Sequence, residues 1–139
     1  MPSQPDGEIP PRDGALPTES AAAWGDRDFG FYVHVPFCAA RCGYCDFNTY
    51  TADELGGFRF EPYVRAVSRE IDLATDIARR RPLASVFIGG GTPSLLPGHH
   101  LKTLMDALRG SFGLEPGAEV TLEANPENVS PEALIGWLE

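Results

Sequence analysis

Apolar and polar residues alternate in two segments of the chain, residues 29–35 and 119–124, and this period of two predicts β-strands. The apolar side of the first segment is formed by Phe29, Phe31, Val33 and Val35. A third segment, residues 83–89, is apolar almost throughout, which is typical of a strand buried in a parallel sheet. The pattern therefore predicts three strands.

Between the strands, apolar residues recur at steps of three and four, which is the spacing of an amphipathic helix. This pattern predicts one helix over residues 61–81 and another over residues 98–112. A third helix is expected after Ser130, a good N-cap residue, because Pro131 suits the first helical position. Residues 46–57 show neither period and are expected to form a loop. The order predicts an α/β fold with a parallel βαβαβα sheet.

The first and third strands carry polar residues on the side opposite their apolar side. These residues are Tyr32, His34, Thr121, Glu123 and Asn125. If the sheet curls, their side chains converge inside it, and α/β barrels carry their working residues at the C-terminal ends of the strands. The pattern therefore predicts a barrel-like sheet with a functional site at the ends of its strands.

The two ends of the chain differ from its middle. Residues 1–28 contain five prolines and no apolar period, so we expect a disordered leader that buries too little surface to fold. The helical pattern that begins at Ser130 is still running at Glu139, with no glycine or proline stop signal. We therefore expect residues 29–139 to be the N-terminal part of a longer domain, truncated at its C-terminus.

Charge and hydropathy narrow the classes of function. The chain has 20 acidic and 11 basic residues, a net charge of −9, which argues against a nucleic-acid partner because such proteins need a basic face. The basic run at residues 79–81 is expected to complement the C-terminus of a helix. No segment has the apolar length of a transmembrane span, and the N-terminus does not resemble a signal peptide. Together with the clustered cysteines, this predicts a cytoplasmic protein.

All three cysteines, Cys38, Cys42 and Cys45, lie within eight residues that follow the first predicted strand. Their spacing, Cys-x3-Cys-x2-Cys, leaves three interpretations open: a 4Fe–4S cluster with one open iron, a zinc site completed by His34, or a Cys-x2-Cys redox pair. The spacing favours the cluster, because a closed structural site uses four protein ligands and this loop supplies three. Arg41, in the same loop, is expected to be a surface residue.

A cysteine loop of this spacing with Tyr44 before its last cysteine resembles the cluster loop of the radical S-adenosylmethionine (SAM) superfamily. The string YVHVPFCAARCGYCDF, followed by GGGTPSLL and then EANP, resembles one branch of it. That branch contains the oxygen-independent coproporphyrinogen III oxidases and the HemW-type haem chaperones. The resemblance runs from Phe31 to the C-terminus, and it implies an open (β/α)6 partial TIM barrel of which the three predicted βα units are the first half.

The resemblance also implies a functional site. Cys38, Cys42 and Cys45 would hold the 4Fe–4S cluster, and the amine and carboxylate of SAM would chelate the open iron before SAM is cleaved to a 5′-deoxyadenosyl radical. The family positions that contact SAM fall on Tyr32, Tyr44, Gly90, Gly91, Thr92 and Glu123. Without the resemblance, the glycine run is a simple turn, Glu123 is a solvated acid, and the tyrosines only pad the cluster with apolar surface.

Two positions separate the two branches. Phe47 stands where the oxidases carry a further cysteine, and Asn125 stands where they tend to have an aspartate. Both favour a HemW-like haem chaperone, whose partners would be haem or a porphyrin, a haem-acceptor protein and an electron donor. One alternative is a coproporphyrinogen III oxidase, an oxidoreductase that decarboxylates its substrate by radical chemistry. The other is a metal-binding module that performs no radical chemistry.

Overall fold

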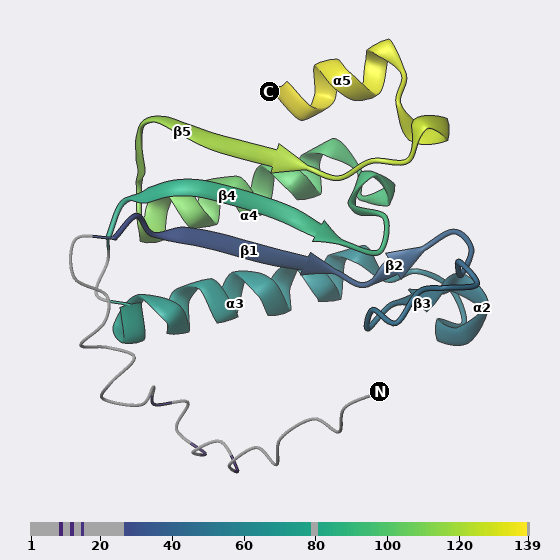
Figure 1. Cartoon of the computed structure of the whole chain (residues 1–139), viewed down its shortest axis with the longest axis horizontal. Helices are drawn as coiled ribbons and strands as arrows, with labels where there is room; N and C mark the ends of the chain where they lie inside the picture. Colours follow the sequence, from purple (N-terminus) through teal and green to yellow (C-terminus); the bar gives the residue numbers. More distant parts are fainter. Residues whose placement is uncertain (1–8, 10–11, 13–14, 16–26, 79–80, 139) are drawn as a thin grey trace.

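The computed structural model describes residues 9, 12, 15, 27–78 and 81–138. Its main sheet has three parallel strands in the order β1-β4-β5, namely β1 (Gly30–Val35), β4 (Leu83–Gly90) and β5 (Leu114–Leu122). Figure 1 shows the three strands running in the same direction, with helical crossovers between them. The predicted parallel βαβαβα order is therefore confirmed, while most of the expected leader, residues 1–28, lies outside the described residues.

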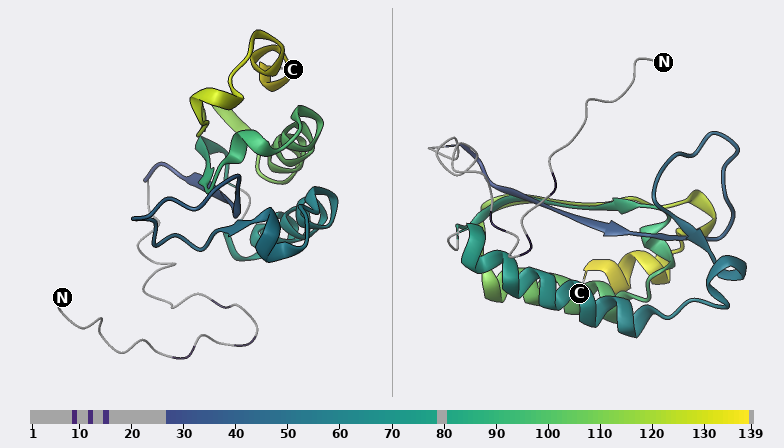
Figure 2. Two further views of the ribbon diagram at one scale, coloured as in Figure 1. Left: turned by 90° about the vertical axis from the view of Figure 1, so that its right-hand side faces the viewer. Right: turned by 90° about the horizontal axis from the view of Figure 1, so that it is seen from below.

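Helices α3 (Phe60–Ala78), α4 (Gly98–Ser111) and α5 (Pro131–Leu138) lie on one side of the sheet (Figures 1 and 2). The first of these was expected to reach residue 81; the described helix ends at Ala78, and residues 79–80 fall outside the described part. The predicted N-cap of α5 is confirmed, because Oγ of Ser130 accepts a hydrogen bond from the backbone N–H of Ala133 at 3.1 Å. No helix among the described residues combines the length and apolar character that crossing a membrane requires.

The hydrophobic core fills the space between the helices and the sheet, and the alternation predicted for β1 places its side chains correctly. Val33 and Val35 are 3% and 0% exposed on the helix side, whereas Tyr32 on the other side is 54% exposed. The helices contribute the residues of their predicted apolar stripes, among them Val64, Ile71, Leu104 and Leu108. One face of the sheet is therefore packed, and the other face is open.

The prediction that β4 is buried on both faces is wrong. Leu83, Val86 and Ile88 are buried against the helices, but Phe87 points to the open face and is 40% exposed. Its ring lies against that of Tyr32, with 6.0 Å between the ring centroids. The continuous apolar run therefore faces two environments: some of its side chains pack in the core, and Phe87 forms part of the aromatic surface of the open face.

Strand β5 begins at Leu114, five residues before the predicted start at residue 119. The first half contains Pro116 and Gly117, residues that normally indicate a turn, and Gly117 has a positive φ of 82°. The ladder to β4 accommodates them through a register shift between Leu83 and Ser85. The strand is thus longer and more irregular than its sequence pattern indicates.

Residues 46–57 contain two short elements where a loop was expected. Strand β3 (Tyr50–Thr51) pairs in parallel with strand β2 (Phe37–Cys38), and helix α2 (Ala52–Leu55) follows directly. Thr51 caps this helix and forms a capping box with Glu54, so that each residue's side chain bonds the other's backbone N–H. The Thr-x-x-Glu signature of a capping box was present in the sequence and was overlooked. The loop that joins β2 to β3 carries the second and third cysteines.

Candidate metal and cofactor site

The candidate site lies where the C-terminal ends of the strands meet the loop that joins β2 and β3. The loop rises on the open side of the sheet, away from the helices (Figure 2). Beyond the ends of β1 and β4, the backbone N–H of Gly91 donates to the carbonyl of Val35 at 2.8 Å, and that of Thr92 donates to the carbonyl of Phe37 at 2.6 Å. The glycine run is thereby joined to the segment that ends in Cys38.

This close approach requires glycine at two positions. A Cβ atom on Gly91 would lie 2.5 Å from the carbonyl oxygen of Phe37 and 2.8 Å from Sγ of Cys38. Gly90 has a φ of +119°, and a Cβ there would lie 2.8 Å from the carbonyl oxygen of Val35. The backbone of the glycine run therefore sits directly beside the first cysteine, which is more than a simple turn requires.

The three cysteines are free thiols in unlike surroundings. Cys38 is buried at 8% exposure, Cys45 is half-buried and Cys42 is exposed. The last two are linked by a turn in which the N–H of Cys45 donates to the carbonyl of Cys42 at 3.1 Å. Among the described residues, no group of three His, Cys, Asp or Glu side chains is arranged to hold a metal ion. Three thiols within eight residues are nevertheless the donor type of a three-thiolate iron–sulfur site.

Glu123 lies just past the end of β5, and its carboxylate reaches across to β4. Its Oε2 accepts a hydrogen bond from the backbone N–H of Gly90 at 3.0 Å. Beside it is a cavity of about 400 Å³, lined by Gly91, Thr92, Pro93, Glu123, Ala124 and Asn125. The structure therefore brings together four of the predicted SAM contacts, namely Gly90, Gly91, Thr92 and Glu123.

The two predicted tyrosines differ. Tyr32 is on the open face, where burial, and to a smaller extent the negative charge of Glu123, raises the pKa of its hydroxyl. Tyr44 lies on the cysteine loop with 90% of its surface exposed. The structure does not bring Tyr44 to the other predicted contacts.

His34 links strand β1 to the cysteine loop. Its Nε2 lies 2.8 Å from the carbonyl oxygen of Asn48, which only accepts hydrogen bonds, so Nε2 carries the hydrogen. Its Nδ1 then accepts from the hydroxyl of Tyr32 at 3.0 Å. Both ring nitrogens are thus engaged, which counts against the interpretation that His34 completes a zinc site.

Sequence reasoning missed two side-chain contacts near the site, one that closes the cysteine loop and one that holds β1. Arg41, expected at the surface, places its Nη2 2.8 Å from the carbonyl oxygen of Thr49 and 2.9 and 3.0 Å from the two carboxylate oxygens of Glu54. Tyr63 on α3 donates from its hydroxyl to the carbonyl of His34 at 2.7 Å, at the outer edge of β1. Neither contact has a local sequence signal, because each joins distant segments.

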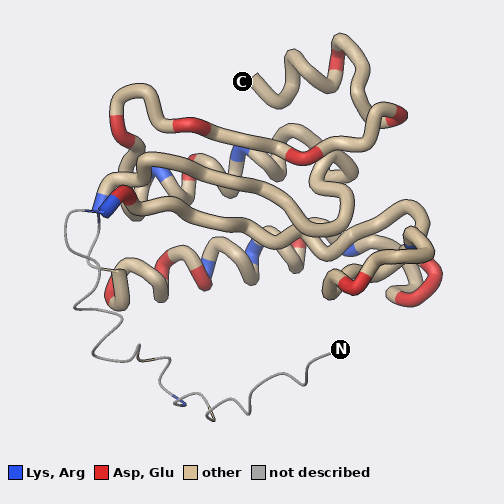
Figure 3. The backbone as a smooth tube through the Cα atoms, in the orientation of Figure 1, with Lys and Arg blue, Asp and Glu red and all other residues tan. Residues whose placement is uncertain are grey.

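Acidic residues spread negative charge along β5 and around α2 (Figure 3), and of those on β5 or just beyond it only Glu123 lies past the C-terminal end of the strand. On β5 and just beyond it these residues are Glu115, Glu119 and Glu123, and on α2 they are Asp53 and Glu54. Such a field favours a cationic ligand over an anionic one.

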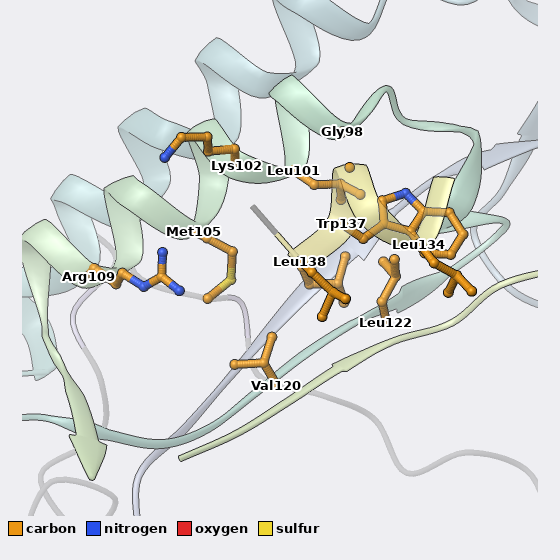
Figure 4. A pocket seen from close by; sticks show the side chains of 12 residues that line it. Gly98, Leu101, Lys102, Met105, Arg109, Val120, Leu122, Leu134, Trp137 and Leu138 are labelled. Atoms are coloured by element: carbon orange, nitrogen blue, oxygen red, sulfur yellow. The ribbon is translucent and has the colours of Figure 1, made fainter. Parts of the chain in front are cut away.

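A separate apolar groove of about 350 Å³ lies between α4, α5 and β5 (Figure 4). It is lined on its apolar walls by Leu101, Met105, Val120, Leu122, Leu134, Trp137 and Leu138. Val120 and Leu138 remain 47% and 88% exposed. This groove contains none of the predicted site residues, and it is distinct from the site at the strand ends.

Comparisons with known proteins agree with one another in pointing to a single superfamily. A family model described as the Radical SAM superfamily matches residues 32–138. The heme chaperone HemW of Mycobacterium tuberculosis is 52% identical over 106 residues, which is 76% of this chain and 27% of that protein. The heme chaperone HemW of Escherichia coli is 38% identical over 106 residues, which is 76% of this chain and 28% of that protein.

A solved structure has the same fold. Coproporphyrinogen III oxidase (HemN) from Escherichia coli, described as a radical SAM enzyme, matches with a TM-score of 0.73 and 27% identity, over 85% of this chain and 27% of that chain. The chain thus spans little more than a quarter of the length of the relatives it matches, 27% and 28% for the two HemW proteins. Its parallel α/β sheet is that of a partial radical SAM barrel. With the family match extending over residues 32–138, the chain belongs to the radical SAM superfamily.

Proposed function

We propose that this chain is the cluster- and SAM-binding part of a HemW-like protein of haem metabolism. The observation that carries the proposal is the contact between three segments, in which Gly91 lies against Cys38 and Glu123 bonds the backbone of Gly90. The curated relatives named as heme chaperones support the same assignment. In this proposal residues 29–139 belong to the radical SAM core, with the three βα units forming its first half.

Cys38, Cys42 and Cys45 are the proposed ligands of a 4Fe–4S cluster. Their free thiols match the ligand type of such clusters, and three ligands leave one iron open for SAM. When bound, the cluster supplies the electron that cleaves SAM. The protein's own contribution is to hold Cys38 at the end of β2, beside the glycine run, and to carry Cys42 and Cys45 on the loop between β2 and β3. Free thiols also support a reducing compartment, and we place the protein in the cytoplasm.

The proposed SAM site is the cavity beside Glu123. SAM carries a cationic sulfonium and an amine that would bind the open iron, and the carboxylate of Glu123 can accept a charge-assisted hydrogen bond from an N–H of that amine. Backbone groups of Gly90, Gly91 and Thr92 are positioned to bond the polar end of the methionine portion. Tyr32 extends the proposed site along the open face of the sheet. Tyr44, carried on the cysteine loop, is the remaining proposed contact.

The choice between chaperone and oxidase rests on the cysteine loop and the relatives. Phe47, in the position of the additional cysteine of the oxidases, is 66% exposed. The higher identity belongs to the HemW proteins, at 52% and 38%, and the lower to HemN, at 27%. We therefore propose haem or a porphyrin as cargo, passed to an acceptor protein, with a separate electron donor. Coproporphyrinogen III oxidation is the second candidate, supported by the structural similarity to HemN.

The test uses the full-length protein, reconstituted with iron and sulfide without oxygen and reduced with dithionite. EPR spectra are recorded with and without SAM, and a parallel reaction with coproporphyrinogen III is assayed for 5′-deoxyadenosine and decarboxylated porphyrin. A cluster signal that shifts with SAM, without porphyrin product, is the expected result. Decarboxylated porphyrin would establish the oxidase instead. A signal that SAM leaves unchanged would indicate a metal-binding module without radical chemistry.

A further inference from the structure

A side chain joins the two ends of the loop that carries Cys42 and Cys45, and we call this junction of residues 41 and 49 the neck of the loop. Arg41, at the start of the loop, bonds the carbonyl of Thr49, at its end, with 2.8 Å between Nη2 and the oxygen. The same nitrogen lies 2.9 Å from the nearer carboxylate oxygen of Glu54 on α2. Both cysteines therefore sit between two residues that are eight apart in sequence and joined in space.

The partner carboxylate is itself held in place. Oε2 of Glu54 accepts hydrogen bonds from the backbone N–H of Thr51 at 2.7 Å and from its hydroxyl at 3.0 Å. Thr51 lies opposite Cys38 in the β2–β3 ladder. Thr51, on the strand that pairs with β2, is thus bonded through Glu54 to Arg41, the residue that precedes Cys42.

The geometry points to Arg41 as a positioning residue that closes the neck of the cysteine loop and limits where Cys42 and Cys45 can lie relative to Cys38. A loop without this bond has more conformations to lose when three sulfurs bind one metal group. Arg41 and Glu54 are 42% and 45% exposed, so their ion pair adds little to the stability of the whole fold. Its effect falls on the loop, and therefore on cluster retention.

This inference rests on the proposed cluster site, so the experiment separates the two. Three variants of the full-length protein are prepared: Arg41→Ala removes the bond, Arg41→Lys keeps a cation with N–H donors, and Glu54→Gln keeps the capping box while removing the charge. The control is Arg65→Ala, which removes an exposed ion pair to Glu61 on α3, with 3.3 Å between the charged atoms. Hydrogen exchange at residues 42–48 is measured in the metal-free protein.

In the reconstituted protein, the EPR spectrum of the reduced cluster and the rate of iron release to a chelator are measured. We expect Arg41→Ala to accelerate both loop exchange and iron release by roughly fivefold to tenfold, as the loss of an ion pair and a hydrogen bond implies. Glu54→Gln should give a smaller change, Arg41→Lys should restore most of the wild-type behaviour, and Arg65→Ala should change neither rate.

Equal exchange and release rates in Arg41→Ala and Arg65→Ala would overturn the inference while leaving the cluster site standing. So would a melting temperature of metal-free Arg41→Ala that falls far below that of Arg65→Ala, because the residue would then act on the fold as a whole. Failure of the wild-type protein to take up iron would refute the proposed function instead. Loop exchange in the metal-free variants would then still show whether Arg41 closes the loop.

Discussion

Oε2 of Glu123 accepts a hydrogen bond from the backbone N–H of Gly90, 33 residues earlier in the chain, at a distance of 3.0 Å. The backbone N–H of Glu123 also donates to the carbonyl of Ile88 at 3.0 Å, so two bonds hold this residue against the end of β4. The side chain nevertheless remains exposed, and a ligand can reach its other oxygen. The carboxylate is thus oriented before any ligand arrives, which lowers the entropic cost of binding one.

Replacing Glu123 by glutamine should weaken SAM binding without unfolding the site. Glutamine still accepts the hydrogen bond from Gly90 but carries no negative charge to strengthen a hydrogen bond from the amine of SAM. A hydrogen bond to a charged group contributes about 1.5–3 kcal/mol, so we expect the Kd for SAM to rise roughly tenfold to a hundredfold. Calorimetric titration of the reconstituted protein measures this change.

The matched control for Glu123→Gln is Glu119→Gln, four residues earlier on β5, whose carboxylate accepts a hydrogen bond from the hydroxyl of Thr121 at 2.8 Å. Iron content should be unchanged in both variants, because neither residue contacts a cysteine. If Glu119→Gln weakened SAM binding as much as Glu123→Gln did, the general negative field would account for the effect, and Glu123 would have no specific role.

Gly91→Ala should destabilise the protein and disturb Cys38. The added methyl group would lie 2.5 Å from the carbonyl oxygen of Phe37, a backbone atom that cannot move aside without shifting β2. Overpacking of this kind costs about 1–3 kcal/mol, which should lower the urea midpoint at an unchanged m-value. The control is Gly110→Ala on α4, where a Cβ meets no atom within 4 Å and should stabilise the helix by up to about 1 kcal/mol. If the urea midpoint of Gly91→Ala equalled that of the wild type, the close approach of Gly91 to the carbonyl oxygen of Phe37 would be contradicted.

The regular elements of this fold were predictable because their signals are local. Alternation along β1 separated buried Val33 and Val35 from exposed Tyr32, and steps of three and four on α3 identified buried Val64 and Ile71. Each of these patterns reflects which side of an element faces the core, and the helices packed on one side of the sheet fix that side for all three strands. Periodicity therefore sufficed for the layers of the fold.

Local patterns failed to predict the structure where a run of one residue type faces two environments, and where turn-forming residues lie inside a strand. Phe87 is as apolar as its neighbours on β4, so nothing in the run indicated that it faces the open side. Pro116 and Gly117 signalled a turn, yet β5 continues through them because a register shift absorbs the irregularity. Helix α2 has only four residues, too few for a period, and only its capping box indicated it.

The sequence predicted which residues belong to the candidate site, but it did not predict how they are arranged. The cysteine spacing and the glycine run are contiguous motifs, and the sequence places them at strand ends. The bond from Arg41 to Glu54 and the bond from His34 to Asn48 depend on the path of the loop, which no short pattern encodes. The sequence predicts which groups are present, and the packing of the loop decides which of them meet.

Tyr63 should make the stability of the protein sensitive to alkaline pH. Burial is the main cause that raises the pKa of its hydroxyl above the ordinary value of about 10, with a further contribution from the charge of Glu70. Because the folded state holds this proton more tightly than the unfolded state, the free energy of unfolding is unaffected below pH about 10 and falls as the pH rises above it. Urea midpoints measured between pH 8 and 11 report this loss.

Tyr63→Phe removes both the titrating group and the hydrogen bond to the carbonyl of His34. The variant should be less stable than the wild type at pH 8 by about 1 kcal/mol, and it should lose less stability between pH 8 and 11. Tyr50→Phe is the control, since Tyr50 is 41% exposed on β3 and its hydroxyl donates to the nearby side-chain oxygen of Asn48 at 2.9 Å. If Tyr63→Phe lost as much stability between pH 8 and 11 as the wild type does, groups other than Tyr63 would be the cause.

The three thiols should react at different rates before metal is bound and become equally protected afterwards. Reactivity toward an alkylating agent requires an accessible thiolate, and Cys38 is 8% exposed while Cys42 is exposed on the loop. In the metal-free full-length protein we expect Cys42 to react first and Cys38 last, at least roughly tenfold more slowly because its reaction requires local opening. Peptide mass spectrometry after timed alkylation gives each rate.

Reconstitution with iron and sulfide should then protect all three cysteines together, because thiolates bound to a shared cluster are no longer free to attack. The urea-unfolded protein is the control, in which burial is lost and the three rates should become similar. Protection of Cys42 and Cys45 while Cys38 stays reactive would indicate a two-thiol site and contradict the three-thiolate assignment. Equal rates for Cys38 and Cys42 in the folded metal-free protein would show that β2 does not shield the first cysteine, and that the glycine run does not hold it in place.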